Sequence, residues 1–274
     1  MKKALCTIFA AAVLLCGCGD GSNGQNNGIS AGNSASAEAV SFVGKWQTKE
    51  VKINGMTSNS DFEKDTGLSV ASAFQMEIND DGTGTVKKVR ELKEDSIEWK
   101  EESGKLMIKP TGSDDKNYIT FSPEGGALSA TENIHVSYGI YSSSSSWINS
   151  IVCEKVDSFY NTTDTRRYAL SSAGKTLFAT ISGSLSDLKD QGKYIDISTG
   201  WNRFDLKHDA AATDLQKSIA SALEYEGFTE GVVEFYVDRD IYSCKNVKIT
   251  DASGITGEFD TEEFAKALGL RNNY

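Results

Sequence analysis

The sequence predicts a β-rich N-terminal part, an antiparallel meander or barrel, followed by an α+β C-terminal domain. Up to about residue 157, apolar and polar residues alternate over short segments, and Phe74, Met76 and Ile78 share one face of such a segment. Turn-forming residues such as Asp80-Asp81-Gly82 separate the segments. Further along the chain the apolar residues recur at spacings of three and four, which is typical of helices. The predicted domains are therefore 40–157 and 158–274.

Several segments of the N-terminal part have the alternation expected of strands. No long helical stretch interrupts them, and only 60–73 fits a short helix. Many short strands in regular succession are typical of a meander that closes or half-closes into a barrel. The predicted strands are 43–53, 74–78, 84–89, 96–100, 105–108, 118–121, 127–131, 134–141 and 148–156.

The C-terminal domain begins with a long predicted helix at 165–191. Leu170, Leu177, Ile181 and Leu185 form its apolar stripe, and Gly192 is a natural C-terminal stop. A second helix is predicted at 211–225, followed by strands at 232–236 and 245–250. A last helix is expected from Asp260, where Asp260 and Glu263 can form a capping arrangement.

The N-terminus has the features of an export signal. Lys2 and Lys3 precede an uncharged, mostly apolar stretch at 4–15. This stretch is too short to span a bilayer, because a membrane helix needs about 20 apolar residues. It fits the apolar region of a secretory signal.

The run Leu15-Cys16-Gly17-Cys18 that follows resembles the lipobox of bacterial lipoproteins. The resemblance implies removal of residues 1–17 by cleavage between Gly17 and Cys18, with lipid attached to Cys18. An ordinary signal peptide cut near Gly19, with Cys18 as an incidental thiol, is the alternative. The lipoprotein interpretation predicts an anchor in the cell membrane, with the rest of the chain on its extracytoplasmic face.

Residues 18–39 are rich in Gly, Ser, Asn and Ala. Such a composition does not bury enough apolar surface to offset the entropy of ordering, so it predicts a flexible tether. Several acyl chains on one cysteine would anchor the protein stably, since each buried CH2 group contributes about 0.8 kcal/mol.

Short motifs also mark residues 40–157. In chain order, these motifs are Val43-Gly44-Lys45-Trp46, Asn79-Asp80-Asp81-Gly82-Thr83-Gly84-Thr85, Ile97-Glu98-Trp99 and Ile151-Val152-Cys153-Glu154-Lys155. Their sequence is similar to that of the lipocalin-like domain of many Gram-positive lipoproteins, which implies a β-barrel. The serine-rich stretch 142–146 departs from the usual tight final hairpin. The long helix and strand hairpin of 158–274 are similar to pilin-like domains, although the membrane-spanning half of a pilin's first helix is missing.

Composition restricts the partners and the redox chemistry. The formal net charge of −11 makes nucleic acid an unfavourable partner, because like charges repel. Once Cys18 carries lipid, Cys153 and Cys244 are the cysteines that remain. An exported protein can join them in a disulfide, and two separate buried thiols are the alternative.

The sequence offers no complete catalytic or metal-binding pattern. Ser172-Ala173-Gly174-Lys175 matches the S-x-x-K motif, but the S-D-N and K-T-G motifs needed for its proton relay are missing. The acidic turn at 77–88 has Lys88 where a calcium loop requires glutamate. His135 and His208 are the only histidines, and no C-x-x-C pair accompanies them. We therefore expect no catalytic residue, no metal and no cofactor.

Trp147 and Trp201 lie in polar stretches flanked by glycine or serine. Burial against the domain is the simpler expectation, whereas exposure would offer them to a sugar or to a partner surface. The sequence predicts a non-enzymatic, membrane-anchored binding or interaction module for a small ligand, glycan or protein. A carboxylate-dependent extracellular hydrolase and a structural subunit of a surface assembly are the alternatives.

Overall fold

The computed structural model describes residues 41–114, 117–131, 134–140, 146–192, 198–211, 213–238 and 240–267. Residues 40–274 form one compact unit. Two hydrophobic cores lie within it, one built mainly by the N-terminal strands and the other by the C-terminal helices and sheet.

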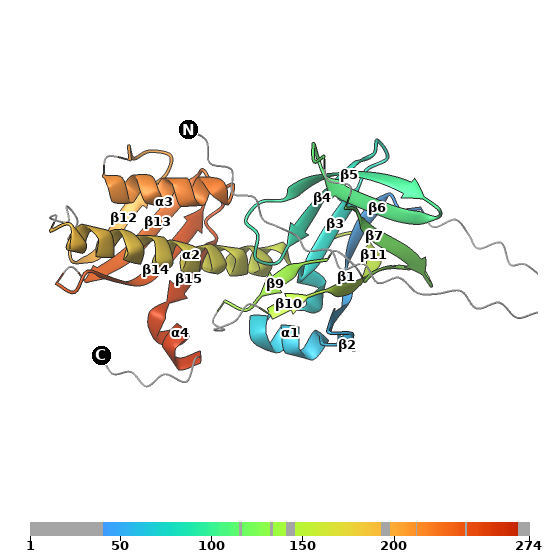
Figure 1. Cartoon of the computed structure of the whole chain (residues 1–274), viewed down its shortest axis with the longest axis horizontal. Coiled ribbons are helices and arrows are strands. Elements are labelled where there is room, and N and C mark those ends of the chain that lie inside the picture. Colours follow the sequence, from blue (N-terminus) through green and yellow to red (C-terminus); the bar gives the residue numbers. More distant parts are fainter. Residues whose placement is uncertain are drawn as a thin grey trace, which may run out of the picture. The chain divides into compact units, whose positions relative to one another are not determined.

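The N-terminal part is a closed antiparallel barrel of eight strands (Figure 1). From β3 to β8 each strand pairs with the next one along the chain, and β1 closes the ring by pairing with both β3 and β11. This confirms the predicted fold class, and the architecture is consistent with a lipocalin-like fold. The barrel strands are β1 (Gly44–Ile53), β3 (Phe74–Ile78), β4 (Thr83–Lys88), β5 (Asp95–Glu102), β6 (Lys105–Pro110), β7 (Ile119–Glu124), β8 (Ala127–Ala130) and β11 (Ser150–Val156).

The end of the meander differs from the prediction. The segment expected as a strand at 134–141 contains only the short β9 (Val136–Tyr138), which pairs with β10 (Ser146–Ile148) in a separate two-stranded sheet. Residues 141–145, with most of the serine-rich stretch, lie outside the described residues. The short strand β2 (Met56–Thr57) pairs with the end of β1.

The predicted short helix is present as α1 (Asn59–Thr66), followed by the 3-10 turn η1 (Val70–Ser72). Phe62 of α1 is fully buried and its ring lies 5.2 Å from that of Tyr138 of β9. Both residues belong to the barrel core, so α1 and β9 contribute to the packing of the barrel interior.

The α+β part contains α2 (Thr162–Asp190), β12 (Gly200–Asp205), α3 (Asp214–Tyr225), β13 (Gly231–Asp238), β14 (Ser243–Asp251), β15 (Thr256–Asp260) and α4 (Thr261–Ala267). The strands form one antiparallel sheet in the order β12-β13-β14-β15. The predicted helices and two of these strands are confirmed, whereas the sequence did not predict β12 or β15.

Helices α2 and α3 lie on one face of this sheet (Figure 1). The helix α2 approaches β15 so closely that a Cβ atom on Gly257 would lie 2.4 Å from the backbone nitrogen of Ser171. The amide of Glu258 in turn donates a hydrogen bond to the Ser171 hydroxyl. Thus α2 covers part of the β15 edge as well as the sheet face.

Polar contacts join α2 to the barrel part. Nε of Arg90 donates to the Ser172 hydroxyl at 2.9 Å, Nζ of Lys175 donates to the carbonyl of Ile140 at 2.7 Å, and the Tyr168 hydroxyl accepts from the amide of Gly139. The serine and lysine of the S-x-x-K match therefore take part in packing contacts.

Candidate functional site

The predicted anchor residues Gly17 and Cys18, and the tether 18–39, lie outside the described residues. Their assignment therefore rests on the sequence.

Cys153 and Cys244 are free, buried thiols. Cys153 lies in β11 of the barrel and Cys244 in β14 of the second sheet, and each belongs to a different hydrophobic core. The structure therefore has two separate thiols in place of the disulfide that the sequence allowed. Burial raises the pKa of Cys153 well above the ordinary range and that of Cys244 to about 12, so neither is a reactive nucleophile.

The two histidines have different surroundings. The ring of His135 lies edge-on at 6.4 Å from that of Trp147, and Nδ1 of His208 lies 3.1 Å from the Asp205 carboxylate in an exposed turn. In the described part of the chain, no group of three or more His, Cys, Asp and Glu residues is arranged to hold a metal ion.

Five of the described carboxyl groups have a shifted pKa. Those with a shifted pKa are all shifted downward, which is opposite to the shift expected of a general acid in a glycoside hydrolase. They are Asp81, Glu98, Glu102, Asp205 and Asp251.

The barrel interior is filled by side chains. Trp46, Phe74, Met76, Leu106 and Phe121 are fully buried, and the rings of Phe74 and Phe121 lie 6.1 Å apart. Small barrels of eight strands are commonly filled in this way. The barrel mouth is therefore a poor candidate for a ligand site.

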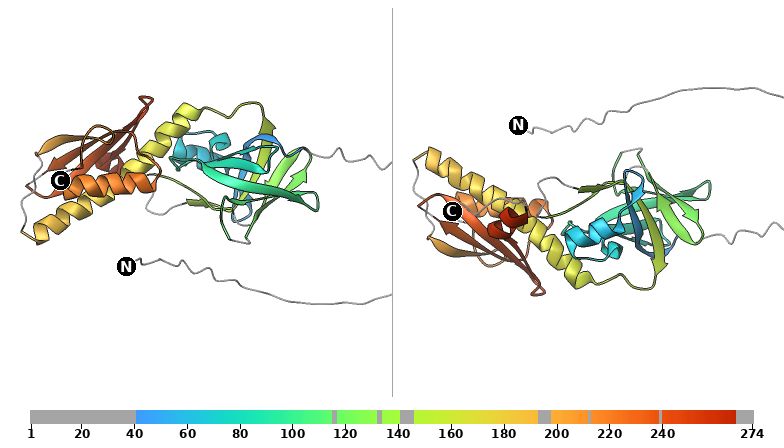
Figure 2. Two further views of the ribbon diagram at one scale, coloured as in Figure 1. Left: turned by 90° about the horizontal axis from the view of Figure 1, so that it is seen from above. Right: turned by 90° about the horizontal axis from the view of Figure 1, so that it is seen from below.

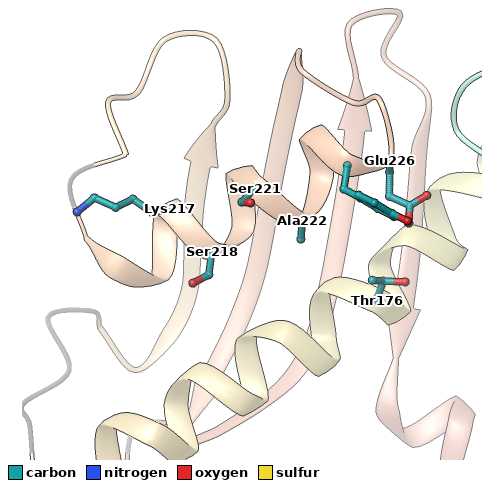
Figure 3. A pocket seen from close by; sticks show the side chains of 7 residues that line it. Thr176, Lys217, Ser218, Ser221, Ala222 and Glu226 are labelled. Carbon is teal, nitrogen blue, oxygen red and sulfur yellow. The ribbon is translucent and has the colours of Figure 1, made fainter. Parts of the chain in front are cut away.

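A shallow groove runs between α2 and α3. Figure 3 shows Ser218, Ser221 and Ala222 along α3, with Thr176 projecting from α2. Lys217 and Glu226 also line it, and Tyr225 is its only aromatic residue. The groove has few polar groups that converge on a common point, so it has little of the chemistry expected of a specific ligand site.

The open face of the C-terminal sheet is the strongest candidate. Figure 2 shows this face without a covering helix or strand among the described residues. Side chains of the four strands form cross-strand rows on it. One row contains Trp201, Tyr236, Asn246 and Asp260, and the next contains Arg203, Glu234, Lys248 and Glu258.

Trp201 is the centre of an aromatic cluster on this face. Its side chain is 49% exposed, and its ring lies 5.8 Å from that of Tyr236 in an edge-to-face arrangement. Nζ of Lys248 lies 4.9 Å from the Trp201 ring centroid and 3.6 Å from the carboxylate of Glu258. These contacts fix the orientation of Trp201 and leave about half of its surface in solvent, which is typical of an interface anchor.

Asn246 adds a polar group to the same row. Its side-chain nitrogen donates to Glu258 at 2.8 Å and to Asp260 at 3.1 Å, which fixes the orientation of the amide. Its Oδ1 atom is buried and has no hydrogen-bond partner among the described residues. A buried carbonyl oxygen without a donor costs free energy, and polar groups of this kind occur at functional surfaces.

Strand β12 forms an edge of the sheet with free backbone groups. The amide of Leu206 donates to the carbonyl of Gly231, so the hydrogen-bonded positions of the antiparallel pair include Phe204 and Asn202. The backbone N–H and C=O groups of Trp201 and Arg203 therefore point away from β13. No described residue pairs with them.

Trp147 is 54% exposed and lies in β10. This strand belongs to the two-stranded sheet, whereas Trp201 lies in the four-stranded sheet. The sequence predicted both tryptophans as candidate contact residues, and the structure does not bring them together on one sheet. Trp201 differs from Trp147 in lying on a four-stranded sheet, where cross-strand rows of polar side chains adjoin it. The sequence pattern does not reveal Tyr236, Asn246 and Lys248 as part of this surface, because their place beside Trp201 depends on the strand register.

No family model, curated protein or solved structure matches the chain. Every helix in the described part of the chain is too short or too polar to cross a membrane.

Proposed function

We propose that this chain is a lipid-anchored extracytoplasmic interaction module that binds a protein partner through β12 and the adjoining sheet face. The open edge of β12 beside the half-exposed Trp201 is the observation that carries the proposal. The partner would add an extended segment to β12 and place a side chain against the Trp201 ring.

The anchor belongs to this proposal through the sequence. Lys2 and Lys3, the apolar stretch 4–15 and the run Leu15-Cys16-Gly17-Cys18 together match the signal of a bacterial lipoprotein. Acylation of Cys18 would hold the barrel and the C-terminal sheet near the membrane. The tether 18–39 would have a root-mean-square reach of roughly 25 Å if it is flexible.

We assign the barrel to the lipocalin-like domains of Gram-positive lipoproteins as part of the same proposal. The closed antiparallel ring of eight strands supports this assignment. Its filled interior favours a scaffold over a carrier of small molecules. The partner is therefore expected on the outer surface of the protein.

A protein partner fits the β12 edge better than a glycan does. The outward N–H and C=O groups of Trp201 and Arg203 have the spacing that an extended peptide requires, and main-chain pairing supplies affinity in this mode of binding. The opposite edge of the sheet is partly covered, because Ser171 of α2 accepts a hydrogen bond from the amide of Glu258. The Trp201 ring then supplies an apolar contact beside the main-chain contacts.

Site-specific photo-crosslinking in the producing cells tests the proposal. A photoreactive amino acid replaces Trp201 in one full-length variant and Trp147 in a matched control, since both positions are about half exposed. We expect a discrete protein adduct from position 201 and none of that mass from position 147. Substitution of Tyr236 by alanine should reduce the adduct, because Tyr236 orients the ring at position 201.

Two results would contradict the proposal. The first result is that positions 201 and 147 give adducts of equal intensity, which would show that the partner does not bind specifically at the surface around Trp201. The second result is that no protein adduct forms and that the protein sediments with purified cell-wall glycan only when Trp201 is present. The partner would then be a glycan and the proposal of a protein partner would be wrong.

A further inference from the structure

A second surface has the chemistry of an anion site. A groove of about 440 Å³ lies where the barrel strand β4, the start of α2 and the β14–β15 hairpin meet. Its charged lining consists of Lys87 and Glu94 from the barrel part, Arg166 from α2 and Asp251 from the hairpin. Thr162, the first residue of α2, adds a hydroxyl group.

Lys87 ends a row of polar side chains on the outer wall of the barrel. Gln47, Gln75 and Lys87 lie opposite one another on β1, β3 and β4. Gln47 accepts a hydrogen bond from the amide of Tyr160 at 3.0 Å, and Gln75 donates one to the Tyr160 carbonyl at 3.3 Å. These bonds hold the connection to α2 against the barrel wall, and both Thr162 and Lys87 line the groove beside it.

The ammonium group of Lys87 is partly buried and forms no hydrogen bond or ion pair with a described residue. Burial lowers its pKa, Glu94 raises it and Arg166 lowers it, with a net downward shift. The N-terminal end of α2 adds a partial positive charge near Thr162. An unpaired cation in such surroundings costs free energy that a bound anion would recover.

The acidic groups nearby are largely engaged elsewhere. The Asp251 carboxylate accepts hydrogen bonds from Arg166, from the amide and hydroxyl of Ser253 and from the amide of Ile255. Asp164, in the first turn of α2, pairs with Arg167. Glu94 is exposed and acts on Lys87 only as a nearby charge, without a direct ion pair among the described residues.

Arg166 also has a free side. Its Nε bonds Asp251 and its Nη1 bonds the carbonyl of Leu92, whereas no described residue bonds its Nη2. The Nη2 group of Arg166, the ammonium group of Lys87 and the hydroxyl group of Thr162 lie on neighbouring elements and are donors suited to the oxygens of a phosphate group. The volume of the groove lies in the range of small-molecule sites and exceeds that of a phosphate group. The groove therefore has space for an organic group attached to the phosphate.

We propose that this groove binds a phosphomonoester through Lys87, Arg166 and Thr162. The inference uses a surface other than the β12 edge and does not depend on the proposed function.

Calorimetric titration of the full-length chain in detergent with glycerol 3-phosphate tests the proposal, at constant ionic strength and with glycerol as the uncharged reference. We expect saturable binding of glycerol 3-phosphate and none of glycerol. Lys87→Gln should weaken binding about tenfold, in line with the loss of one charged hydrogen bond. Glu94→Gln should strengthen binding about threefold, because it removes a negative charge that lines the groove and acts on Lys87.

Lys49→Gln is the matched control, since Lys49 lies exposed on β1 and its substitution makes the same change in net charge. The proposal is overturned if glycerol 3-phosphate shows no saturable binding, or if Lys49→Gln weakens it as much as Lys87→Gln does.

The phosphate group could also belong to a lipid headgroup. Phosphatidylcholine vesicles with and without phosphatidic acid, added to the Cys18→Ala chain, distinguish that source. Where glycerol 3-phosphate binds as expected, Lys87-dependent binding to the vesicles with phosphatidic acid, and not to those without it, supports the site and identifies a lipid headgroup as a ligand.

Discussion

Nε of Arg166 donates a hydrogen bond to Oδ2 of Asp251 at 2.9 Å, and this ion pair joins α2 to the β14–β15 hairpin. Both side chains are largely buried. Because removal of one partner leaves the other charge buried without compensation, we predict that Asp251→Asn lowers the free energy of unfolding by about 2–3 kcal/mol. Urea unfolding at pH 7 measures the change, and a loss below 0.5 kcal/mol would contradict it.

The same pair predicts a dependence of stability on pH. Burial acts to raise the pKa of Asp251, but hydrogen bonds from Ser253, Arg166 and Ile255 outweigh it and the pKa is lowered. A carboxyl group with a lowered pKa contributes stability above its unfolded pKa of about 3.9, and the contribution is lost as the pH falls through the folded pKa. The difference in stability between wild type and Asp251→Asn should therefore be constant from pH 7 to about pH 5 and shrink towards pH 3. A difference that grows on acidification would contradict this assignment.

Gly257→Ala should be strongly destabilising, because its Cβ would lie 2.4 Å from Ser171 N and 2.5 Å from Leu170 Cβ. Relief of the clash requires α2 to move away from β15, so we expect a loss of at least about 2 kcal/mol, as in overpacked cores. Gly183→Ala in the same helix is the control, since a Cβ there meets no atom within 4 Å. It should stabilise the protein by about 0.5–1 kcal/mol. Thermal unfolding compares the stability of the two variants. Equal changes in stability would contradict the close contact between α2 and β15.

The two buried thiols predict a simple labelling result. Native protein at pH 8 should react slowly with a thiol reagent, because burial shields Cys153 and Cys244 and raises the pKa of both. In denaturant without reductant, both residues should react. Failure of the pair to react under those conditions would show that a disulfide joins them.

The filled barrel predicts a large effect of Phe121→Ala. Phe121 is fully buried and packs against Phe74, so its truncation should cost about 3–5 kcal/mol. Denaturant unfolding measures this cost. A loss below 1 kcal/mol would instead indicate an interior with space to spare.

Regular patterns along the chain predicted the barrel well. Phe74–Ile78 has the same bounds in the sequence prediction and in the structure, because its apolar residues alternate without interruption. The long helix α2 was also predicted, since its apolar stripe extends over several turns. Helix α3 begins at Asp214, later than predicted, because Thr213 and Gln216 form a capping box that sets its start.

The strands β12 and β15 were missed for a physical reason. Each is a short edge strand with few buried residues, and Phe204 is the one buried side chain of β12. One of the two buried residues of β15 is Gly257, so neither strand has two apolar side chains in alternation for a sequence pattern to detect. The surface around Trp201 could not be predicted either, because Tyr236 and Asn246 reach it only through the register of separate strands.

The lipid anchor at Cys18 is the central prediction for this protein, and cell fractionation of the Cys18→Ala variant tests it most directly. Wild-type protein should remain with the membrane fraction, and Cys18→Ala protein should appear in the soluble extracytoplasmic fraction or the medium. Retention of the Cys18→Ala protein in the membrane fraction at the wild-type level would contradict the account.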